Sequence, residues 1–318
     1  MRAKTLTLAA LVIALAAPRA AAFGKGDKGT SGAQFLKVAP GARPASMGEA
    51  FGAVSGDVHS VYYNPAGLGS VSRVQVTGSH AALFQGVNYE FAAVAVPMLA
   101  WVNTEKPKNQ YGTLAVSLYN LSVSGIERRS LIETDSAIDT FGAGDFGYAL
   151  SYGYELPETG LSLGATAKFI DSKIDSYKGS AMAADFGAQY KAGKATLGAG
   201  ARNAGSRHSL GSGDPLPLTL FGAASYKVSD GLLAAFELRQ PRDNSLSAAF
   251  GGEYRHEFGE KLSGALRAGY NSANKDADGF NGVSFGVGLG VSNFDFDFAL
   301  VPFGDLGNAY RYSLVVKF

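Results

Sequence analysis

From residue 73 to the end of the chain, apolar residues occupy every second position in blocks that short polar stretches separate. Fourteen such blocks can be counted, and they are clearest at residues 161–169, 216–220, 283–291 and 294–300. In each block one face is apolar and the other is small, polar or charged. A period of two is the signature of a β-strand, so the pattern predicts an all-β protein.

The same alternation fits either a soluble sandwich with its apolar face inward or a membrane barrel with its apolar face outward. Aromatic residues near the strand ends favour the barrel, because transmembrane barrels carry aromatic girdles at both membrane interfaces. These aromatic residues are Tyr152, Tyr154, Tyr190, Tyr226, Tyr254, Tyr270 and Tyr310. The opposite face carries the charges expected of a polar lumen, namely Lys168, Asp185, Arg202, Glu237, Arg239, Glu253, Arg255, Arg267, Asp295, Asp297 and Arg311.

The lengths of the connections between blocks test the barrel independently, because outer-membrane barrels alternate short periplasmic turns with longer external loops. The short connections fall at residues 157–160, 192–194, 229–231, 258–261 and 292–293. The longer ones fall at residues 172–179, 203–214, 240–244, 272–281 and 302–308, and the longest at about 122–142. Residues 97–110 break the alternation, and we expect a small periplasmic helix there. Together these features predict a fourteen-stranded antiparallel transmembrane β-barrel over residues 73–318.

The last block alternates to the final residue of the chain. Its apolar face consists of Tyr310, Tyr312, Leu314, Val316 and Phe318. A terminal aromatic residue after such a strand resembles the signal that the barrel assembly machinery reads in outer-membrane proteins. An amphipathic strand that simply ends the chain is the alternative. We expect assembly by that machinery, with outer-membrane lipid around the finished barrel.

The N-terminus predicts export. Arg2 and Lys4 precede an uncharged apolar run at residues 5–17, which ends at the small residues 20–22. This is the pattern of a secretory signal peptide covering residues 1–22 and cut before Phe23. The run is too short to cross a hydrocarbon core of about 30 Å as a helix, and no later segment holds 18 consecutive apolar residues. We therefore expect no helical membrane span.

Composition excludes several other classes of protein. The chain has no Cys, so disulfides, thiolate metal sites and a lipoprotein anchor are all excluded. Loss of residues 1–22 removes three of the 28 Lys and Arg residues and leaves 25 against 27 Asp and Glu. A nearly neutral chain gives no reason to expect nucleic acid as a partner. Periplasm, outer membrane and medium remain as destinations.

Residues 23–72 lack the alternation and contain helix-compatible stretches near residues 44–54 and 62–68. A barrel of fourteen strands has a lumen wider than its own side chains fill. We therefore expect this segment to insert into the barrel as a plug rather than to hang in the periplasm.

The plug segment also carries a family resemblance. Residues 35–51 (FLKVAPGARPASMGEAF) and 62–68 (YYNPAGL) resemble the PorV/PorQ family, and so do residues 294–314 of the closing hairpin. That family is similar to the FadL class of fatty-acid channels. The resemblance implies a fourteen-stranded barrel in which the segment around the Asn-Pro-Ala motif folds back as a hatch. The hatch residues it points to are Arg43, Met47, Gly48, Asn64, Pro65 and Ala66.

Four patterns that carry chemistry in other proteins are weak here. Residues 142–147 fit a dinucleotide-binding glycine pattern, but they open a strand where a helix is required. Residues 274–279 resemble a calcium loop, yet Phe285 stands where the bidentate Glu belongs, which favours a solvated loop. His59, His80, His208 and His256 show no metal-ligand spacing. No Ser-His-Asp or paired-carboxylate motif can be assembled, although such sites are defined by space rather than spacing. We expect neither catalysis, nor a metal, nor a cofactor.

Charges on the inner face of the last strands form the remaining candidate site, which consists of Arg267, Asp295, Asp297 and Arg311. A hairpin centred near residue 305 places Arg311 opposite Ala299 and diagonal to Asp297. We expect a charge pair that stabilises this hairpin and contacts the plug. If the pair is part of a gate, Arg43 of the plug is its expected partner.

Two roles stay open. The chain is expected to pass or present cargo across the outer membrane, with uptake of small hydrophobic solutes favoured. The alternative is an accessory barrel of a type IX secretion system with a secreted protein as cargo. A purely structural barrel would do neither.

Overall fold

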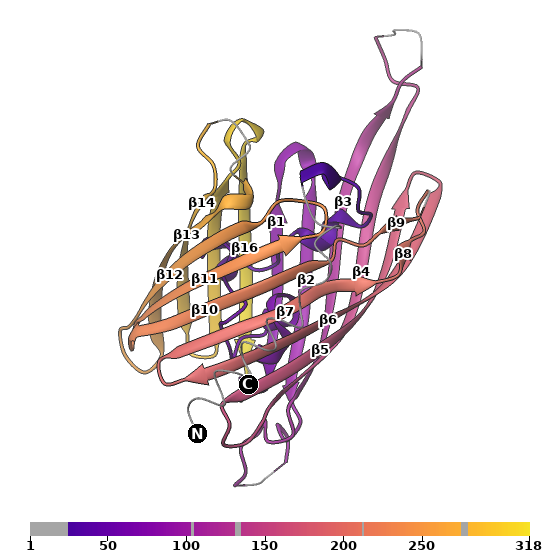
Figure 1. Cartoon of the computed structure of the whole chain (residues 1–318). Coiled ribbons are helices and arrows are strands. Elements are labelled where there is room, and N and C mark those ends of the chain that lie inside the picture. The colour runs from indigo at the N-terminus through magenta and orange to yellow at the C-terminus, as the bar shows by residue number, and fades with distance from the viewer. Residues whose placement is uncertain (1–24, 103–104, 131–134, 212, 275–278) are drawn as a thin grey trace.

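The computed structural model describes residues 25–102, 105–130, 135–211, 213–274 and 279–318. Within them fourteen antiparallel strands form one closed barrel (Figure 1). The barrel strands are β1 (Gln75–Ala82), β2 (Asn88–Pro97), β3 (Thr113–Arg128), β4 (Asp139–Glu155), β5 (Leu161–Ile174), β6 (Tyr177–Ala192), β7 (Ala195–Gly205), β10 (Thr219–Ser229), β11 (Leu232–Pro241), β12 (Ser247–Glu257), β13 (Leu262–Asn271), β14 (Val283–Val291), β15 (Phe294–Pro302) and β16 (Asn308–Lys317). The predicted fold class and strand number are confirmed.

The last strand closes the barrel against the first. β16 pairs with β15 on one side and with β1 on the other, from Gln75 opposite Lys317 to Ala82 opposite Tyr310. Closure leaves no unpaired sheet edge, which is the condition for a β-structure to span a bilayer.

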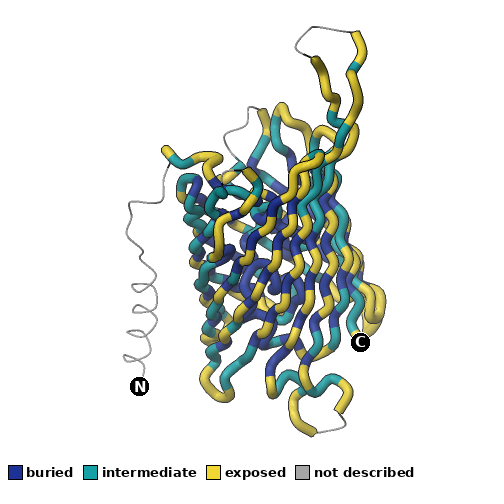
Figure 2. The backbone as a smooth tube through the Cα atoms, turned by 90° about the vertical axis from the view of Figure 1, so that its right-hand side faces the viewer, coloured by how far each residue is buried: buried dark blue, intermediate teal, exposed yellow. Residues whose placement is uncertain are grey.

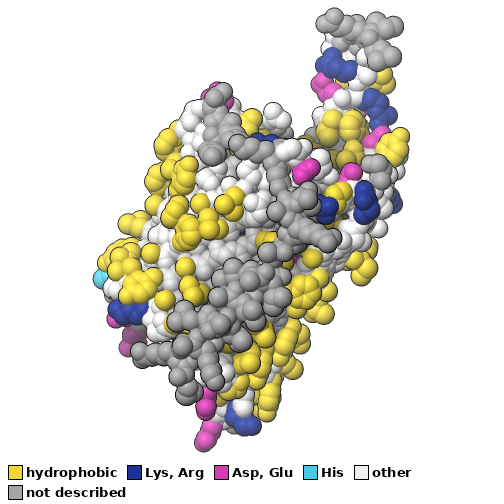
Figure 3. Space-filling view, in the orientation of Figure 1, with side chains coloured by type: hydrophobic (Ala, Val, Ile, Leu, Met, Phe, Trp, Pro, Cys, Tyr) yellow, Lys and Arg dark blue, Asp and Glu magenta, His cyan; other side chains and the backbone are white. Residues whose placement is uncertain are grey.

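The two faces of the wall have opposite character. Along β16, Arg311 and Ser313 are buried, whereas Tyr312 and Leu314 are 41% and 42% exposed. A similar alternation of buried and exposed positions is seen along many of the strands visible in Figure 2. Figure 3 shows hydrophobic side chains along the outer face, with charged side chains mainly toward the two ends. An apolar exterior around a polar interior is the arrangement of a membrane barrel, not of a soluble sandwich.

The connections agree with the predicted alternation, with three corrections. Residues 172–179 are not a long loop, because β5 and β6 stay paired as far as Ile174 and Tyr177 and turn at Asp175, whose φ is 55°. Polar residues here continue the strands beyond the apolar band, and Asp tolerates the left-handed conformation that a tight turn needs. This polarity is what made the stretch resemble a loop in the sequence.

The second and third corrections concern residues 122–142 and 97–110. β3 and β4 extend through most of the former range to Arg128 and from Asp139, and they form an arm that projects beyond the barrel rim (Figure 1). In the latter range the described residues 98–102 and 105–112 contain turns and no helix. Residues 203–214 do hold a longer connection, which includes the small hairpin of β8 (Arg207–His208) and β9 (Asp214–Pro215).

Residues 31–71 lie inside the barrel and are mostly buried (Figure 2). Short turns of helix separate their extended stretches: η3 (Gln34–Lys37), α2 (Ala42–Ser46), α3 (Ser60–Tyr63) and η4 (Pro65–Ser70), with η2 (Lys25–Asp27) outside the buried part. Three further turns, η5 (Phe84–Gly86), η6 (Ser272–Asn274) and η7 (Gly304–Leu306), lie in the long connections. We call residues 31–71 the plug.

The main apolar core of the molecule lies between the plug and the inner wall rather than in the wall itself. Tyr63, Phe51 and Leu68 of the plug are fully buried there beside Tyr89 of β2. Among the described residues, no helix is long and apolar enough to cross a membrane. The predicted signal peptide, residues 1–22, lies outside the described residues.

Candidate functional site

Glycines of the inner wall make room for the Asn-Pro-Ala motif of the plug. A Cβ atom added to Gly164 would lie 2.2 Å from the Pro65 carbonyl carbon, and one added to Gly187 would lie 1.9 Å from Asn64 Oδ1. Asn64 Nδ2 donates to the Gly52 carbonyl at 2.7 Å, and its Oδ1 accepts from the Ala66 amide at 3.1 Å. The motif therefore fixes both the local turn and the seat of the plug on β5 and β6.

Met47 and Gly48 of the plug have a second seat on the opposite wall. A Cβ on Gly269 would lie 2.0 Å from the Gly48 amide nitrogen, and one on Gly251 would lie 2.4 Å from the Met47 carbonyl oxygen. The Gly48 amide donates to Ser284 Oγ at 3.1 Å. The plug backbone lies directly against the wall backbone here, which explains why small residues occur on both sides of the contact.

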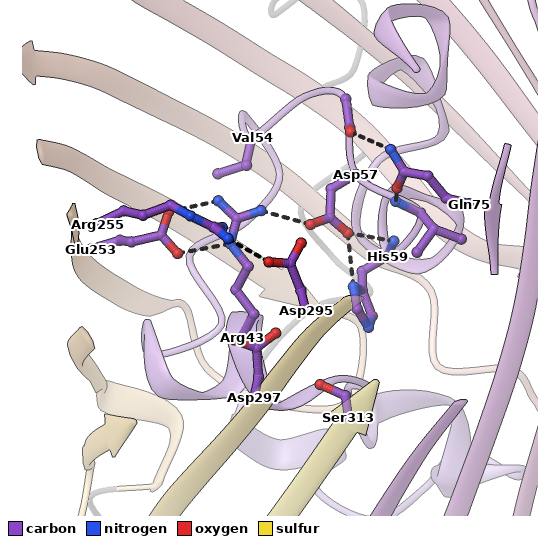
Figure 4. Close-up of polar contacts among 12 residues, drawn as sticks. Arg43, Val54, Asp57, His59, Gln75, Glu253, Arg255, Asp295, Asp297 and Ser313 are labelled. Carbon is purple, nitrogen blue, oxygen red and sulfur yellow. Dashed lines mark hydrogen bonds and ion pairs between the residues drawn. The ribbon is translucent and has the colours of Figure 1, made fainter. Parts of the chain in front are cut away.

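Arg43 joins the plug to the wall electrostatically. It donates to Glu253 of β12 through Nε at 2.8 Å and Nη2 at 2.7 Å, and to Asp57 of the plug through Nη1 at 2.7 Å (Figure 4). Asp57 in turn contacts His59 Nδ1 at 2.7 Å. Burial alone would raise the pKa of the Asp57 carboxyl, but His59 and Arg43 hold that pKa well below its usual range. Asp57 therefore stays ionised in the folded protein.

The four predicted lumen charges all lie in this region, but their pairing differs from the prediction. The register is confirmed, since Arg311 lies opposite Ala299. Asp297, however, accepts from Arg267 at 2.7 Å, and Arg267 also donates to Glu253 at 2.5 Å. Arg311 instead donates to the Ala39 carbonyl of the plug.

The reason for the different pairing is that β13 and the plug supply nearer partners than the diagonal of the last hairpin. Asp295 pairs with Lys317 at 2.7 Å and also contacts Arg255. Arg43, expected as a partner of Asp297 or Arg311, is held by Asp57 and Glu253. The last hairpin is therefore tied to the plug through Arg311.

A second buried network was missed as a site by the sequence analysis, although its wall residues were predicted to face inward. Glu237 is fully buried and accepts from Arg202 at 2.6 Å and from the Gly52 amide at 2.7 Å. Arg239 donates to Glu237 at 2.8 Å and to Glu49 of the plug at 3.0 Å. No sequence spacing links these residues, because the plug bend that presents Gly52 is visible only in three dimensions.

A cavity of about 310 Å³ lies between the plug and the wall at the end of the barrel that carries the long connections. Leu36 and Val38 of the plug line it together with Leu83, Phe84 and Phe303 from two long connections. Its polar lining includes Glu49, Arg202, Arg239 and Arg311. Lys37, another lining residue, donates to Asp243 of the β11–β12 connection at 2.9 Å and ties the plug to the rim.

The described residues give no support to a metal or hydrolytic site. No group of three or more His, Asp or Glu side chains among them is arranged to hold a metal ion. His208 Nε2 does lie 3.0 Å from Ser172 Oγ, but both residues are buried and closed to a substrate. The candidate calcium loop at 274–279 falls mainly on residues 275–278, outside the described residues. The glycine pattern at 142–147 lies within strand β4, as expected.

The predicted assembly signal lies on the closing strand. Tyr310, Tyr312 and Leu314 face outward, and Phe318 is 68% exposed at the end of the chain. Val316 lies in the same outward row, opposite Phe294 of β15 and Val76 of β1. Whether the assembly machinery reads this face stays a prediction.

The fold is similar to that of solved FadL-like outer-membrane barrels. No family model matches the sequence, and no characterised protein matches it by sequence. Among solved structures, the Pseudomonas putida toluene transporter TodX is similar with a TM-score of 0.58 at 10% identity, over 87% of this chain and 97% of that one. The Ralstonia pickettii toluene transporter TbuX is similar with a TM-score of 0.55 at 12% identity, over 87% and 97%.

A Pseudomonas aeruginosa FadL homologue is similar over 94% of this chain and 99% of its own, with a TM-score of 0.53 at 11% identity. At such low identity the similarity establishes the fold, a closed fourteen-strand barrel of the outer membrane, and not the function.

Proposed function

We propose that this protein is a passive channel through which small hydrophobic solutes enter across the outer membrane. The observation that carries the proposal is the cavity at the outer end of the lumen, where apolar side chains of the plug and of two long connections meet. Apolar cavities of about 150 Å³ are large enough to hold benzene, so about 310 Å³ admits a one-ring solute. TodX and TbuX, both described as toluene transporters, support this solute class.

Uptake of radiolabelled toluene by cells that express the protein tests the proposal. Leu83→Trp fills the cavity and is expected to reduce uptake about tenfold, to the level of cells without the barrel. Leu306→Trp is the matched control, because Leu306 is exposed on the neighbouring β15–β16 connection and does not line the cavity. Equal uptake by both variants and the unmodified protein would contradict the proposal.

A second proposal is an accessory role in type IX secretion. The PorV/PorQ-like residues at 35–51 and 62–68 favour it, and so does the arm of β3 and β4 that projects beyond the rim, where a protein partner has access. Shortening the arm by deletion of residues 124–142 is then expected to abolish secretion of the cargo without loss of toluene uptake. Co-purification of secretion components with the full barrel, but not with the shortened one, is the direct measurement.

We also propose that the chain reaches this membrane by export and assisted insertion. Cleavage of residues 1–22 predicts a mature protein that begins at Phe23, which N-terminal sequencing measures. Insertion by the barrel assembly machinery predicts that deletion of Phe318 lowers the folded fraction in the outer membrane.

A further inference from the structure

The outward face of β1, β2 and β3 changes from apolar to polar at one row of paired residues. His80 of β1 lies opposite Glu90 of β2, which lies opposite Asn120 of β3. On the short-turn side of this row the outward residues are apolar, and they include Val76, Val94 and Val116. The row therefore marks the outer edge of the apolar band on this part of the wall.

A groove of about 640 Å³ lies on the apolar side of this row. Gly78 and Ala92 lie opposite each other in its floor, so no side chain longer than a methyl group fills this part of the wall. Larger apolar residues flank them: Phe296 and Leu314 on one side, Leu118 and Tyr148 on the other. The β1–β2 ladder is unbroken from Gln75 to Ala82, so the groove is a feature of the outer surface and not a hole in the wall.

The polar row offers hydrogen-bond acceptors at the mouth of the groove. His80 Nδ1 lies 2.6 Å from Glu90 Oε1, and the two side chains are 42% and 53% exposed. The Glu90 carboxylate is therefore accessible from outside the chain, at the edge of the apolar groove.

We propose that this groove binds one lipid, with an acyl chain over Gly78 and Ala92 and an ammonium headgroup beside Glu90. This face of the barrel is surrounded by lipid. The groove is apolar toward the middle of the membrane and polar at the membrane edge, which matches the acyl chain and the headgroup of a lipid. The acyl chain would fill the space that the two small residues leave and supply the dispersion attraction that their short side chains cannot. The ammonium group would donate to the exposed Glu90 carboxylate and complement its charge.

Native mass spectrometry of the purified full-length barrel tests the proposal, with phosphatidylethanolamine and phosphatidylglycerol of identical acyl chains as probes. One phosphatidylethanolamine per barrel is expected to be retained, with about tenfold preference over phosphatidylglycerol. Gly78→Leu and Ala92→Leu each fill the groove and are expected to abolish retention of both lipids. The substitution at Gly78 needs no movement of the wall, because a Cβ there meets no atom within 4 Å.

Gly222→Leu on β10 is the control, since Gly222 also faces outward and also has nothing within 4 Å of an added Cβ. The lipid site would be overturned if both groove-filling variants retained as much lipid as this control. It would also be overturned if the unmodified barrel formed a dimer that only the groove-filling substitutions dissociate. Glu90→Gln is expected to keep the acyl contact but to bind both lipids equally. Unchanged preference in that variant, or no preference in the unmodified barrel, would overturn the headgroup assignment.

Discussion

At the scale of single residues, the lumen is organised by charges that each have a partner on another element. Arg43 is held between the plug and β12, and Glu237 is held between β7, β11 and the plug backbone. Such buried pairs are weak evidence for net stability, but loss of one partner leaves an uncompensated charge. They therefore act mainly to fix where the plug sits.

Arg43→Met is expected to destabilise the folded barrel by about 3–5 kcal/mol, because it leaves Asp57 and Glu253 buried without their shared cation. The measurement is the urea midpoint of unfolding from detergent. Arg129→Met is the control, because Arg129 forms an exposed pair with Glu127 at 2.7 Å and exposed pairs contribute about 0–1 kcal/mol. Equal midpoints for the two variants would refute the role of Arg43.

The pH dependence of stability follows from Asp57. Its pKa in the folded protein lies well below the usual value, so its contribution is fully present above the pKa of the unfolded state and is lost as the pH falls through the folded pKa. Stability is therefore expected to decline below about pH 4. Asp57→Asn should flatten this decline, and an identical pH profile in the variant would contradict the assignment.

At the scale of elements, the strands were predictable because one face of each strand meets lipid and the other meets the lumen. Apolar and polar residues must then alternate with a period of two. The strand number, the closing strand and most short turns followed from it. The arm of β3 and β4 and the β5–β6 turn did not, since beyond the apolar band both faces of a strand meet water and the alternation disappears. The partner of Arg43 was also not predictable, because the plug path brings it to a wall residue 210 positions away. Asp297 pairs with Arg267 across β14, a contact between strands that are not neighbours in the sheet.

The close contact between the plug and the wall glycines predicts that a larger side chain at one of these glycines displaces the plug. Gly164→Val places a side chain where the Pro65 and Ala66 backbone now lies, so the plug is expected to shift while the β-ladders remain. Conductance in planar bilayers should then rise several-fold. Gly222→Val has no plug contact and should conduct as the unmodified barrel does. If the Gly164→Val barrel folds normally but conducts as the unmodified barrel does, the plug does not limit conduction.

At the scale of the whole molecule, the protein is a barrel with an apolar outer face and an interior filled by the plug, where an apolar core and buried charge pairs lie together. The wall presents an apolar face to the membrane, the plug closes the lumen, and the cavity at the outer end would hold the solute of the proposed channel. Because the plug fills the lumen below this cavity, passage requires the plug to move relative to the wall.

Cross-linking of the plug to the rim tests this claim most directly. The chain has no Cys, so Lys37→Cys with Asp243→Cys places a unique thiol pair where the two side chains now meet at 2.9 Å. Toluene uptake through the barrel is measured before reaction with a short cleavable bifunctional thiol reagent, after it, and after cleavage. Uptake is expected to fall to background on cross-linking and to return on cleavage. Undiminished uptake by fully cross-linked barrels would show that the plug need not move.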